Sequence, residues 1–222
     1  MSAPAKIYVV DDDTSFRTAM GDLLTACGFG VVACESAAQL LETPLGDEPG
    51  CILLDVQMAG LSGPQLQDRL AAQGCGLPIV FISGHGDIPT TVQTIKAGAE
   101  DFLTKPVEKE RLLAAIDRAL VRYEEMREQE GRIAALRLRL SRLTPREHEV
   151  LEMLVRGKLH KQIAHELGTA ERTVKLHRHN LMQKFEVRSL AELAVIAERL
   201  GLLPAPGHDT DGLRQSGNKH PS

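Results

Sequence analysis

The sequence lacks tryptophan, and only 3% of its 222 residues are aromatic. Proteins that bind single-stranded nucleic acid by stacking bases on aromatic side chains need more such residues, so that class is disfavoured. No stretch approaches the roughly 18 consecutive apolar residues of a membrane span. The first residues show no basic region followed by an apolar run, so we expect a cytoplasmic protein with no membrane partner.

Cysteines are few, and they form no recognisable motif. The four cysteines show no Cys-x-x-Cys spacing, and all lie in the first half of the chain. This pattern disfavours a structural zinc site and a disulfide framework, and it fits reduced thiols. With 43% hydrophobic and 25% charged residues, the chain has enough apolar side chains for folded cores. Its length fits one large domain or two ordinary ones.

The net charge of −4 hides an asymmetry along the chain. Residues 1–107 carry 13 acidic and 5 basic side chains, whereas residues 142–203 carry 8 acidic and 11 basic ones. We therefore expect the two halves to have different partners. The basic surplus alone is weak evidence for a nucleic-acid partner.

Short apolar runs alternate with amphipathic segments in the first half. We expect strands at 7–10, 31–34, 52–54, 78–82 and around 102–103, and helices at 14–27, 62–73 and 87–97. Thr14 is a plausible N-cap of the first helix. Strands that alternate with helices predict crossover units and a five-stranded, doubly wound parallel sheet of the α/β class.

Polar side chains follow the carboxyl ends of several of these strands: Asp11 and Asp12, Asp55, Ser83 and Lys105. In an open α/β sheet such ends meet at one edge, where ligands bind. Three carboxylates brought together repel one another, so they need a cation or raised pKa values. Mg²⁺ prefers oxygen ligands and is often shared with phosphate oxygens. The lysine ammonium supplies a positive charge where a phosphoryl group could lie.

Four segments carry a resemblance to a known family. They are IYVVDDD at 7–13, LLDVQM at 53–58, IVFISGHG at 79–86 and KAGAEDFLTKP at 96–106. The chain from about 4 to 120 resembles the flavodoxin-like receiver domain of two-component response regulators. The resemblance implies that Asp55 accepts a phosphoryl group from a sensor histidine kinase. It implies a Mg²⁺ cofactor held directly by Asp12, through water by Asp11, by Asp55, and by the main-chain carbonyl of Gln57.

The same resemblance assigns roles around the phosphoryl group. Ser83 and Lys105 would hold its oxygens, and the Lys105–Pro106 bond would be cis. Phe102 would act as a switch that rotates inward after phosphorylation; the alternative is that it is simply a buried strand residue. One departure is Ala59, where the family usually has proline, and we expect it to affect only the lifetime of the phosphoryl group.

Two sequence patterns could indicate an enzyme, but neither has the neighbouring residues or elements that the enzyme would require. The segment GFGVVA at 28–33 matches a dinucleotide-binding glycine pattern, but it follows a helix and enters a strand, the reverse of the required order. Gly28 is better explained as the end of that helix. Asp55 lacks the second aspartate, two residues on, of haloacid-dehalogenase-like phosphatases, because Gln57 occupies that position. We therefore expect no enzyme.

Residues 121–141 are expected to form a helical linker. Apolar residues recur every seven positions at Leu112, Ala119, Met126, Ile133 and Leu140. This pattern could form a coiled-coil dimer seam. We favour instead a last receiver helix that continues as an exposed connector and breaks near Gly131.

The second half is expected to be all-helical. Thr144-Pro145 with Glu147 indicates the start of a helix whose amphipathic part is 149–156, and further helices are expected at 161–167, 171–185 and 189–200, forming a four-helix domain. The helices on either side of 168–170 match a helix-turn-helix, whose second helix lies in the major groove. LTPREHEVL at 143–151, KQIAHELG at 161–168 and TVKLHRHN at 173–180 resemble the LuxR-type DNA-binding domain, over about 142–203. The whole chain thus resembles a NarL/FixJ-type response regulator, with a disordered tail at 204–222.

The LuxR-type resemblance also implies DNA contacts. Lys175, Leu176 and His179 would face base edges, with Lys175 on guanine and Leu176 on a thymine methyl. Contacts to phosphates would come from Lys161, Arg172, Thr173 and Arg178. For each basic residue the alternative is a solvated helix face.

The last helix carries more apolar residues than a small core seems to need. We therefore expect dimerisation through Leu190, Leu193, Ile196 and Leu200. The expected partners are a sensor kinase, promoter DNA, RNA polymerase and a second copy of the chain. The alternative function is a DNA-binding regulator whose first domain is a scaffold that needs no phosphorylation.

Overall fold

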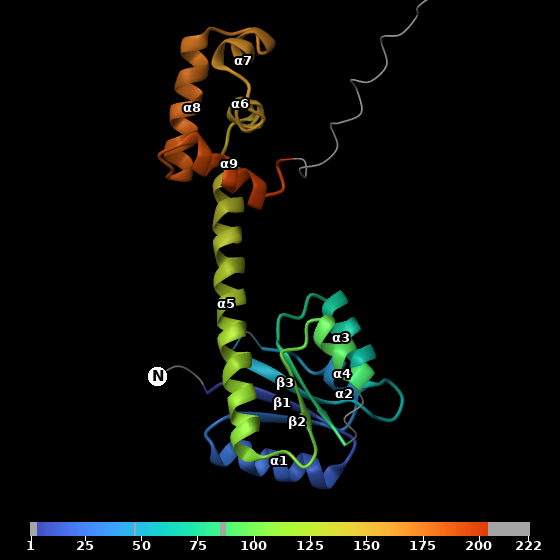
Figure 1. Ribbon diagram of the computed structural model, residues 1–222. Coiled ribbons are helices and arrows are strands. Elements are labelled where there is room, and N and C mark those ends of the chain that lie inside the picture. The colour runs from blue at the N-terminus through green and yellow to red at the C-terminus, as the bar shows by residue number, and fades with distance from the viewer. Residues whose placement is uncertain (1–3, 47, 85–87, 204–222) are drawn as a thin grey trace, which may run out of the picture. The chain divides into compact units, whose positions relative to one another are not determined.

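The computed structural model describes residues 4–46, 48–84 and 88–203 (Figure 1). It divides into two compact units, Met1–Gln129 and Glu130–Ser222. The expected disorder of 204–222 and part of the loop after Ser83, residues 85–87, lie outside the described residues. The domain limits 4–120, 121–141 and 142–203 stay a prediction. Within the described part of the chain, every helix is too short or too polar to cross a membrane.

The first unit contains a parallel sheet of five strands in the order β2-β1-β3-β4-β5. The strands are β1 (Lys6–Val10), β2 (Gly30–Cys34), β3 (Gly50–Asp55), β4 (Ile79–Ser83) and β5 (Asp101–Thr104). The chain moves from β1 outward to β2 and then returns to the other side of β1. The strand order therefore reverses between β1 and β3, where α/β sheets bind their ligands.

Helices cover both faces of this sheet (Figure 1). The helix α1 (Thr14–Ala26) and the first part of α5 (Lys109–Ser141) lie on one face, and α2 (Ala37–Glu42), α3 (Gly63–Ala72) and α4 (Ile88–Lys96) lie on the other. Because neighbouring strand residues point to opposite faces, Ile7 and Val9 belong to one core cluster and Tyr8 and Val10 to the other. The predicted doubly wound sheet is confirmed.

The ends of α1 show one correct and one wrong detail of the prediction. Thr14 is already the first helical residue, and Asp13 is the N-cap, because its carboxylate accepts from the main-chain N–H groups of Ser15 and Phe16. Gly28 does follow the helix end, with a φ of 89° that glycine adopts without strain. The six-residue helix α2 was not predicted, although the Ser36 side chain that caps it was a visible signal.

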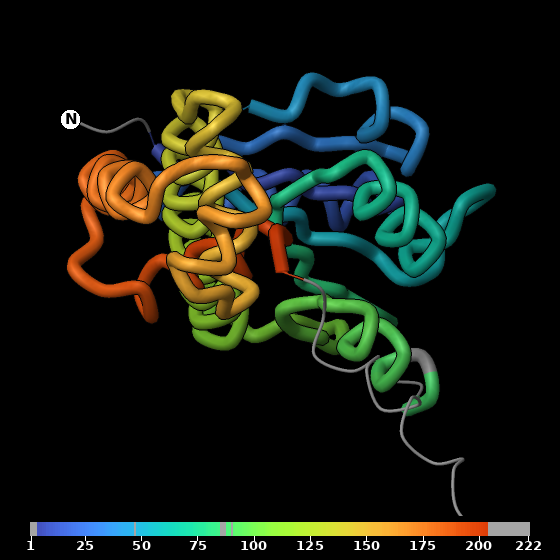
Figure 2. Tube along the Cα trace, turned by 90° about the horizontal axis from the view of Figure 1, so that it is seen from above, coloured from blue at the N-terminus to red at the C-terminus, as the bar shows by residue number. Residues whose placement is uncertain are grey.

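The second unit is helical. Its elements are the last part of α5, then α6 (Pro145–Val155), α7 (His160–Glu166), α8 (Glu171–Phe185) and α9 (Leu190–Arg199), drawn from gold to red in Figure 2. Their apolar faces form one core, with Val150, Leu151, Ile163, Val174 and Leu193 fully buried.

The expected break of α5 near Gly131 is wrong, because the helix runs without interruption through that residue. A glycine inside a helix costs only about 1 kcal/mol relative to alanine, which is too little to end a long helix. Several residues of the possible coiled-coil seam are buried in the cores of the two units. Leu112 and Ala119 are fully buried in the first unit, and Leu140 packs against the core of the second.

Candidate functional site

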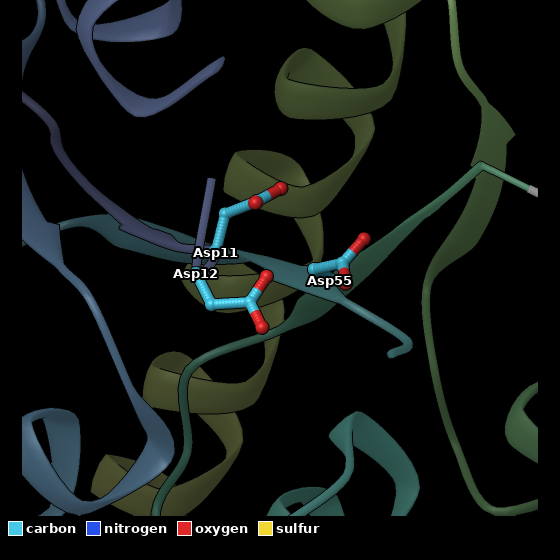
Figure 3. A group of neighbouring side chains, drawn as sticks. All are labelled: Asp11, Asp12 and Asp55. Atoms are coloured by element: carbon cyan, nitrogen blue, oxygen red, sulfur yellow. The ribbon is translucent and has the colours of Figure 1, made fainter. Parts of the chain in front are cut away.

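Three aspartates gather at one edge of the sheet (Figure 3). Asp11 and Asp12 follow β1, and Asp55 ends β3. One carboxylate oxygen from each lies within 4.8 Å of the others. Asp11 and Asp55 are buried, at 1% and 5% exposure, while Asp12 is exposed.

The strand register explains why the sequence brings these residues together. β1 and β3 pair directly, with Val10 opposite Leu54. The next residue on each strand is an aspartate, so Asp11 and Asp55 come to adjacent positions at the sheet edge. Turn contacts then fix the cluster: the main-chain N–H of Asp13 donates to Asp11 Oδ1 at 2.9 Å, and that of Gln57 donates to Asp55 Oδ2 at 3.0 Å.

Lys105, which follows the outermost strand β5, also lies beside the cluster. Its ammonium Nζ lies 2.6 Å from Asp11 Oδ2 and 3.1 Å from Asp55 Oδ1. It also lies 4.2 Å from the centroid of the Phe16 ring. The Lys105–Pro106 bond is cis, as expected, and the Lys105 N–H donates to the carbonyl of Ser83 at 2.7 Å.

These contacts set the protonation of the cluster. Burial raises the pKa of the Asp55 carboxyl above its ordinary value, and the nearby Lys105 ammonium offsets part of that effect. Burial also lowers the pKa of Lys105, but its hydrogen bonds to Asp11 and Asp55 outweigh burial, so the net pKa is raised. The lysine therefore stays charged at neutral pH.

The donor set fits Mg²⁺. Two buried carboxylates and one exposed carboxylate face a single ammonium, which leaves an excess of negative charge around hard oxygen atoms. Arg17 is directed elsewhere, because its guanidinium donates to the main-chain carbonyl of Asp11 at 2.6 Å and to the Thr14 hydroxyl at 3.1 Å. A divalent cation would balance the cluster. The ligand role of the Gln57 carbonyl stays a prediction.

Ala59 makes a contact that the motif pattern did not predict. Its main-chain N–H donates to Asp12 Oδ2 at 3.1 Å. A proline at this position, as expected in the family that the motifs resemble, has no N–H to donate. The departure at Ala59 thus adds a hydrogen bond to one of the three carboxylates.

Ser83 lies at the same edge of the sheet as the cluster, whereas Phe102 lies within β5, opposite Phe81 of β4. Ser83 ends β4 and is buried at 2% exposure. Phe102 in β5 is half-buried, and its ring stacks on that of Phe81 with centroids 6.4 Å apart. The side chain therefore belongs partly to the core, and its inward rotation stays a prediction.

In the second unit, α8 is amphipathic as expected. Val174, Leu181 and Phe185 are buried, and the residues expected at base edges, Lys175, Leu176 and His179, are all exposed. Among the residues expected at phosphates, Lys161 on α7 and Arg172 are exposed, and Thr173 and Arg178 are half-buried. The positions suit a nucleic-acid interface, and the individual DNA contacts stay predictions.

Lys184 is directed away from that interface. Its ammonium lies 2.6 Å from Glu147 Oε2 and donates to the Arg142 carbonyl at 3.2 Å. Glu147 is 4% exposed. Burial raises its pKa, but the bonds to Lys184 and to Thr144 outweigh burial and hold the pKa below its usual range. The capping box with Thr144 predicts the position of Glu147 at the start of α6, but it gives no signal for the pairing with Lys184.

Arg139 at the end of α5 holds the carboxyl end of α8. Its Nη1 donates to the Phe185 carbonyl at 2.7 Å, and its Nη2 to Glu186 Oε2 at 2.6 Å. Glu186 adopts a left-handed φ of 57°, as helix C-caps often do. The pairing spans 46 residues of sequence and had no local signal.

The reason for the expected dimer residues on α9 is wrong. Leu193 is fully buried, and Leu190, Ile196 and Leu200 pack against the same core. These four leucine and isoleucine side chains therefore belong to the core of the unit and are not an excess over what the core needs. Leu193 therefore has no exposed surface in this structure, while Leu190, Ile196 and Leu200 keep part of theirs; the dimer role of these residues stays a prediction.

Comparison with known proteins finds two family models. The response regulator receiver domain matches residues 7–117, and the luxR family of bacterial regulatory proteins matches residues 141–197. Nodulation protein W of Bradyrhizobium diazoefficiens is 42% identical over 201 residues, which cover 90% of this chain and 88% of that protein. The transcriptional regulatory protein FixJ of the same species is 39% identical, over 91% of this chain and 99% of its own.

Two solved structures are similar over most of the chain. The response regulator StyR has a TM-score of 0.71 and 47% identity, covering 89% of this chain and all of its own. Full-length FixJ from B. japonicum has a TM-score of 0.55 and 39% identity, covering 91% of this chain and 100% of its own.

Proposed function

Since this chain belongs to the response regulators of the FixJ/NarL type, which join a receiver domain to a LuxR-type DNA-binding domain, we propose that phosphorylation of Asp55 by a sensor histidine kinase controls its binding to promoter DNA. The family resemblance drawn from the motifs is confirmed, and the chain is a DNA-binding regulator of a two-component system rather than an enzyme. The observation that carries the proposal is the Lys105 ammonium, placed between the buried carboxylates of Asp11 and Asp55.

Phosphoryl transfer uses Asp55 as the nucleophile. One of its carboxylate oxygens forms a bond to phosphorus as the phosphorus–nitrogen bond of the kinase phosphohistidine breaks, and the electron pair leaves with the imidazole. Lys105 holds a positive charge beside Asp55 Oδ1 and so offsets the charge of the incoming group. The Gln57 N–H fixes the other oxygen. Mg²⁺, held by Asp11, Asp12, Asp55 and the Gln57 carbonyl, would neutralise the charge that develops on the phosphoryl oxygens.

The acyl phosphate then changes the balance among the local contacts. Lys105 must share its ammonium with phosphoryl oxygens, so its pairing with Asp11 weakens. The Ser83 hydroxyl can donate to the same oxygens, and Phe102 can then turn toward the core. Because phosphate binds one arrangement better than the other, it shifts the population between two states of the receiver.

The active state binds double-stranded DNA through α8. Its exposed Lys175, Leu176 and His179 enter the major groove, while the neighbouring basic residues contact phosphates. We propose that the phosphorylated protein binds a two-fold site as a dimer, with α9 contributing the exposed parts of Leu190, Ile196 and Leu200. RNA polymerase is the expected partner at the promoter.

The first experiment measures phosphoryl uptake from labelled acetyl phosphate with Mg²⁺ by the full chain. The Asp55→Asn variant is expected to take up none. The matched control Asp68→Asn, on an exposed residue of α3, keeps wild-type uptake. Equal labelling of Asp55→Asn and wild type would contradict the assignment of Asp55. DNA binding that is the same with and without the phosphodonor would favour the scaffold alternative, in which the receiver has no switch.

A second experiment tests the dimer. Analytical ultracentrifugation of the phosphorylated protein on a full DNA site is expected to find two copies per site. A single copy on the full site would refute the proposed dimer and leave the assignment of Asp55 intact.

A further inference from the structure

The surface of α8 presents more than basic and apolar side chains. Its exposed positions recur every three or four residues and form one stripe, opposite the buried Val174 and Leu181. The first side chains of this stripe are Glu171, Arg172, Lys175, Leu176 and His179. Glu171 is the first residue of the helix and the only acidic member of that set.

Glu171 pairs with the residue expected to face guanine. Its Oε1 lies 3.1 Å from Lys175 Nζ, and the two side chains are 47% and 60% exposed. An exposed pair of this kind, four residues apart on a helix, is worth only about 0.3–0.5 kcal/mol. Lys175 is therefore released from Glu171 at little cost when a base acceptor becomes available.

A carboxylate at this place opposes binding to most DNA. The phosphates that surround the groove repel it, and the major-groove acceptors of guanine and thymine offer it no proton. The repulsion is compensated only where the carboxylate meets a donor. In the major groove the amino groups of cytosine N4 and adenine N6 are such donors. Adenine N6 lies beside the N7 acceptor, which repels a carboxylate, so Glu and Asp accept from cytosine.

Helix geometry sets the distance between the two base positions. Four residues advance about 6 Å along an α-helix, and base pairs are spaced by about 3.4 Å, so Glu171 and Lys175 span about two steps. The amino-terminal residues of a recognition helix are those that contact base edges. We propose that Glu171 is a specificity-determining residue, whose carboxylate accepts from the N4 amino group of a cytosine within two base pairs of the guanine that Lys175 contacts. This inference rests on the proposed binding of DNA through α8.

A structural role of Glu171 predicts different effects. The N-cap Ala170 offers no side-chain hydrogen bond, so a negative charge in the first turn also stabilises the positive end of the helix dipole. In that role Glu171 would change the stability of α8 and leave the preference for each base the same. A measurement of base preference separates the two roles.

The experiment selects bound sequences from a randomised DNA library with the full chain, activated by beryllofluoride and Mg²⁺. The proteins are wild type, Glu171→Ala, Glu171→Gln and the control Glu198→Ala, which removes the same charge from an exposed position of α9. Affinities for the selected wild-type site are then measured by fluorescence anisotropy. Thermal unfolding of each variant shows whether α8 stays folded.

The proposal expects a cytosine preference near the guanine position in wild type and in Glu198→Ala. Glu171→Ala should lose that preference alone, so that its discrimination between cytosine and another base at that position falls by up to about 5- to 150-fold, the range of one good base contact. Glu171→Gln should shift the preference toward adenine, which glutamine pairs with. Glu171→Ala and Glu171→Gln with wild-type base preferences, whatever their overall affinity or stability, would overturn the role of Glu171. A wild type that selects no sequence would overturn the proposed function itself.

Discussion

Gly63 is the position where the packing around the acidic cluster is tested most sharply. It is the first residue of α3, and its N–H donates to the Val56 carbonyl at 3.1 Å, directly after Asp55. A Cβ at Gly63 would lie 2.9 Å from a ring carbon of Phe81 and 3.1 Å from Val56 Cα, and it would lie closer still to the main-chain oxygen of Asp55. Two of these atoms belong to the main chain, which is not free to move aside.

The Gly63→Ala substitution therefore moves either the end of β3 or the start of α3. About half an ångström restores an ordinary contact with Phe81, and the closer main-chain oxygen of Asp55 needs a larger shift. Overpacking of this kind costs about 1–3 kcal/mol, and a helical Gly→Ala change returns about 0.5–1 kcal/mol. We expect a net loss between about 0 and 2.5 kcal/mol. Since a displacement of about 1 Å can cost a reaction about 100-fold, a shift of half an ångström or more should slow phosphoryl uptake at Asp55 by at least about tenfold.

The assay uses the natural fluorophores of the chain. There is no tryptophan, and the two tyrosines, Tyr8 and Tyr123, both lie in the first unit. Tyrosine fluorescence during urea unfolding therefore reports the stability of the receiver. The control is Gly21→Ala in α1, where an added Cβ meets nothing within 4 Å and should stabilise the helix. A Gly63→Ala protein as stable as Gly21→Ala, with wild-type phosphoryl uptake, would refute the packing argument.

Three further predictions concern single contacts. Burial raises the pKa of Asp55 in the folded state, so the folded protein binds a proton more readily than the unfolded chain and loses stability as pH rises through the raised pKa. Without Mg²⁺, Asp55→Asn should therefore be more stable than wild type at pH 7 in urea unfolding. The difference in stability should vanish below pH 4. Ala59→Pro removes the N–H that orients Asp12, so calorimetry should find Mg²⁺ binding about 3- to 10-fold weaker than in Ala59→Gly. Equal affinities of the two variants would show that this hydrogen bond does not contribute to Mg²⁺ binding. Arg139→Ala should lower DNA affinity about 5- to 10-fold, because α8 loses two hydrogen bonds at its end. The control Arg137→Ala, at an exposed position of α5, should bind DNA like wild type.

The residues of the acidic cluster could be predicted because a rule of chain geometry connects them. Parallel strands place their carboxyl ends at one edge, so Asp11, Asp55 and Lys105 meet although they lie far apart in sequence. The sequence also showed the buried face of α8 by its periodicity. Contacts made by the side chains of distant residues left no such pattern, and the bond from Arg139 to the end of α8 is one of them.

The errors have a common physical origin. Local signals compete, and tertiary packing decides between them. Asp13 and Thr14 are both good N-cap residues, but Thr14 is already helical, and the Asp13 carboxylate accepts from the main-chain N–H groups of Ser15 and Phe16. The apolar residues of α9 indicated a surface for a second copy, but the small core of the unit needs Leu193 for itself.

Coupling between Asp55 and DNA is the central claim, and one gel-shift titration tests it most directly. Wild type and Asp55→Asn are titrated on the same selected promoter fragment, each with and without beryllofluoride and Mg²⁺. Tighter binding by wild type alone, only when beryllofluoride and Mg²⁺ are present, is the predicted result. Identical curves for both proteins under both conditions would contradict the account.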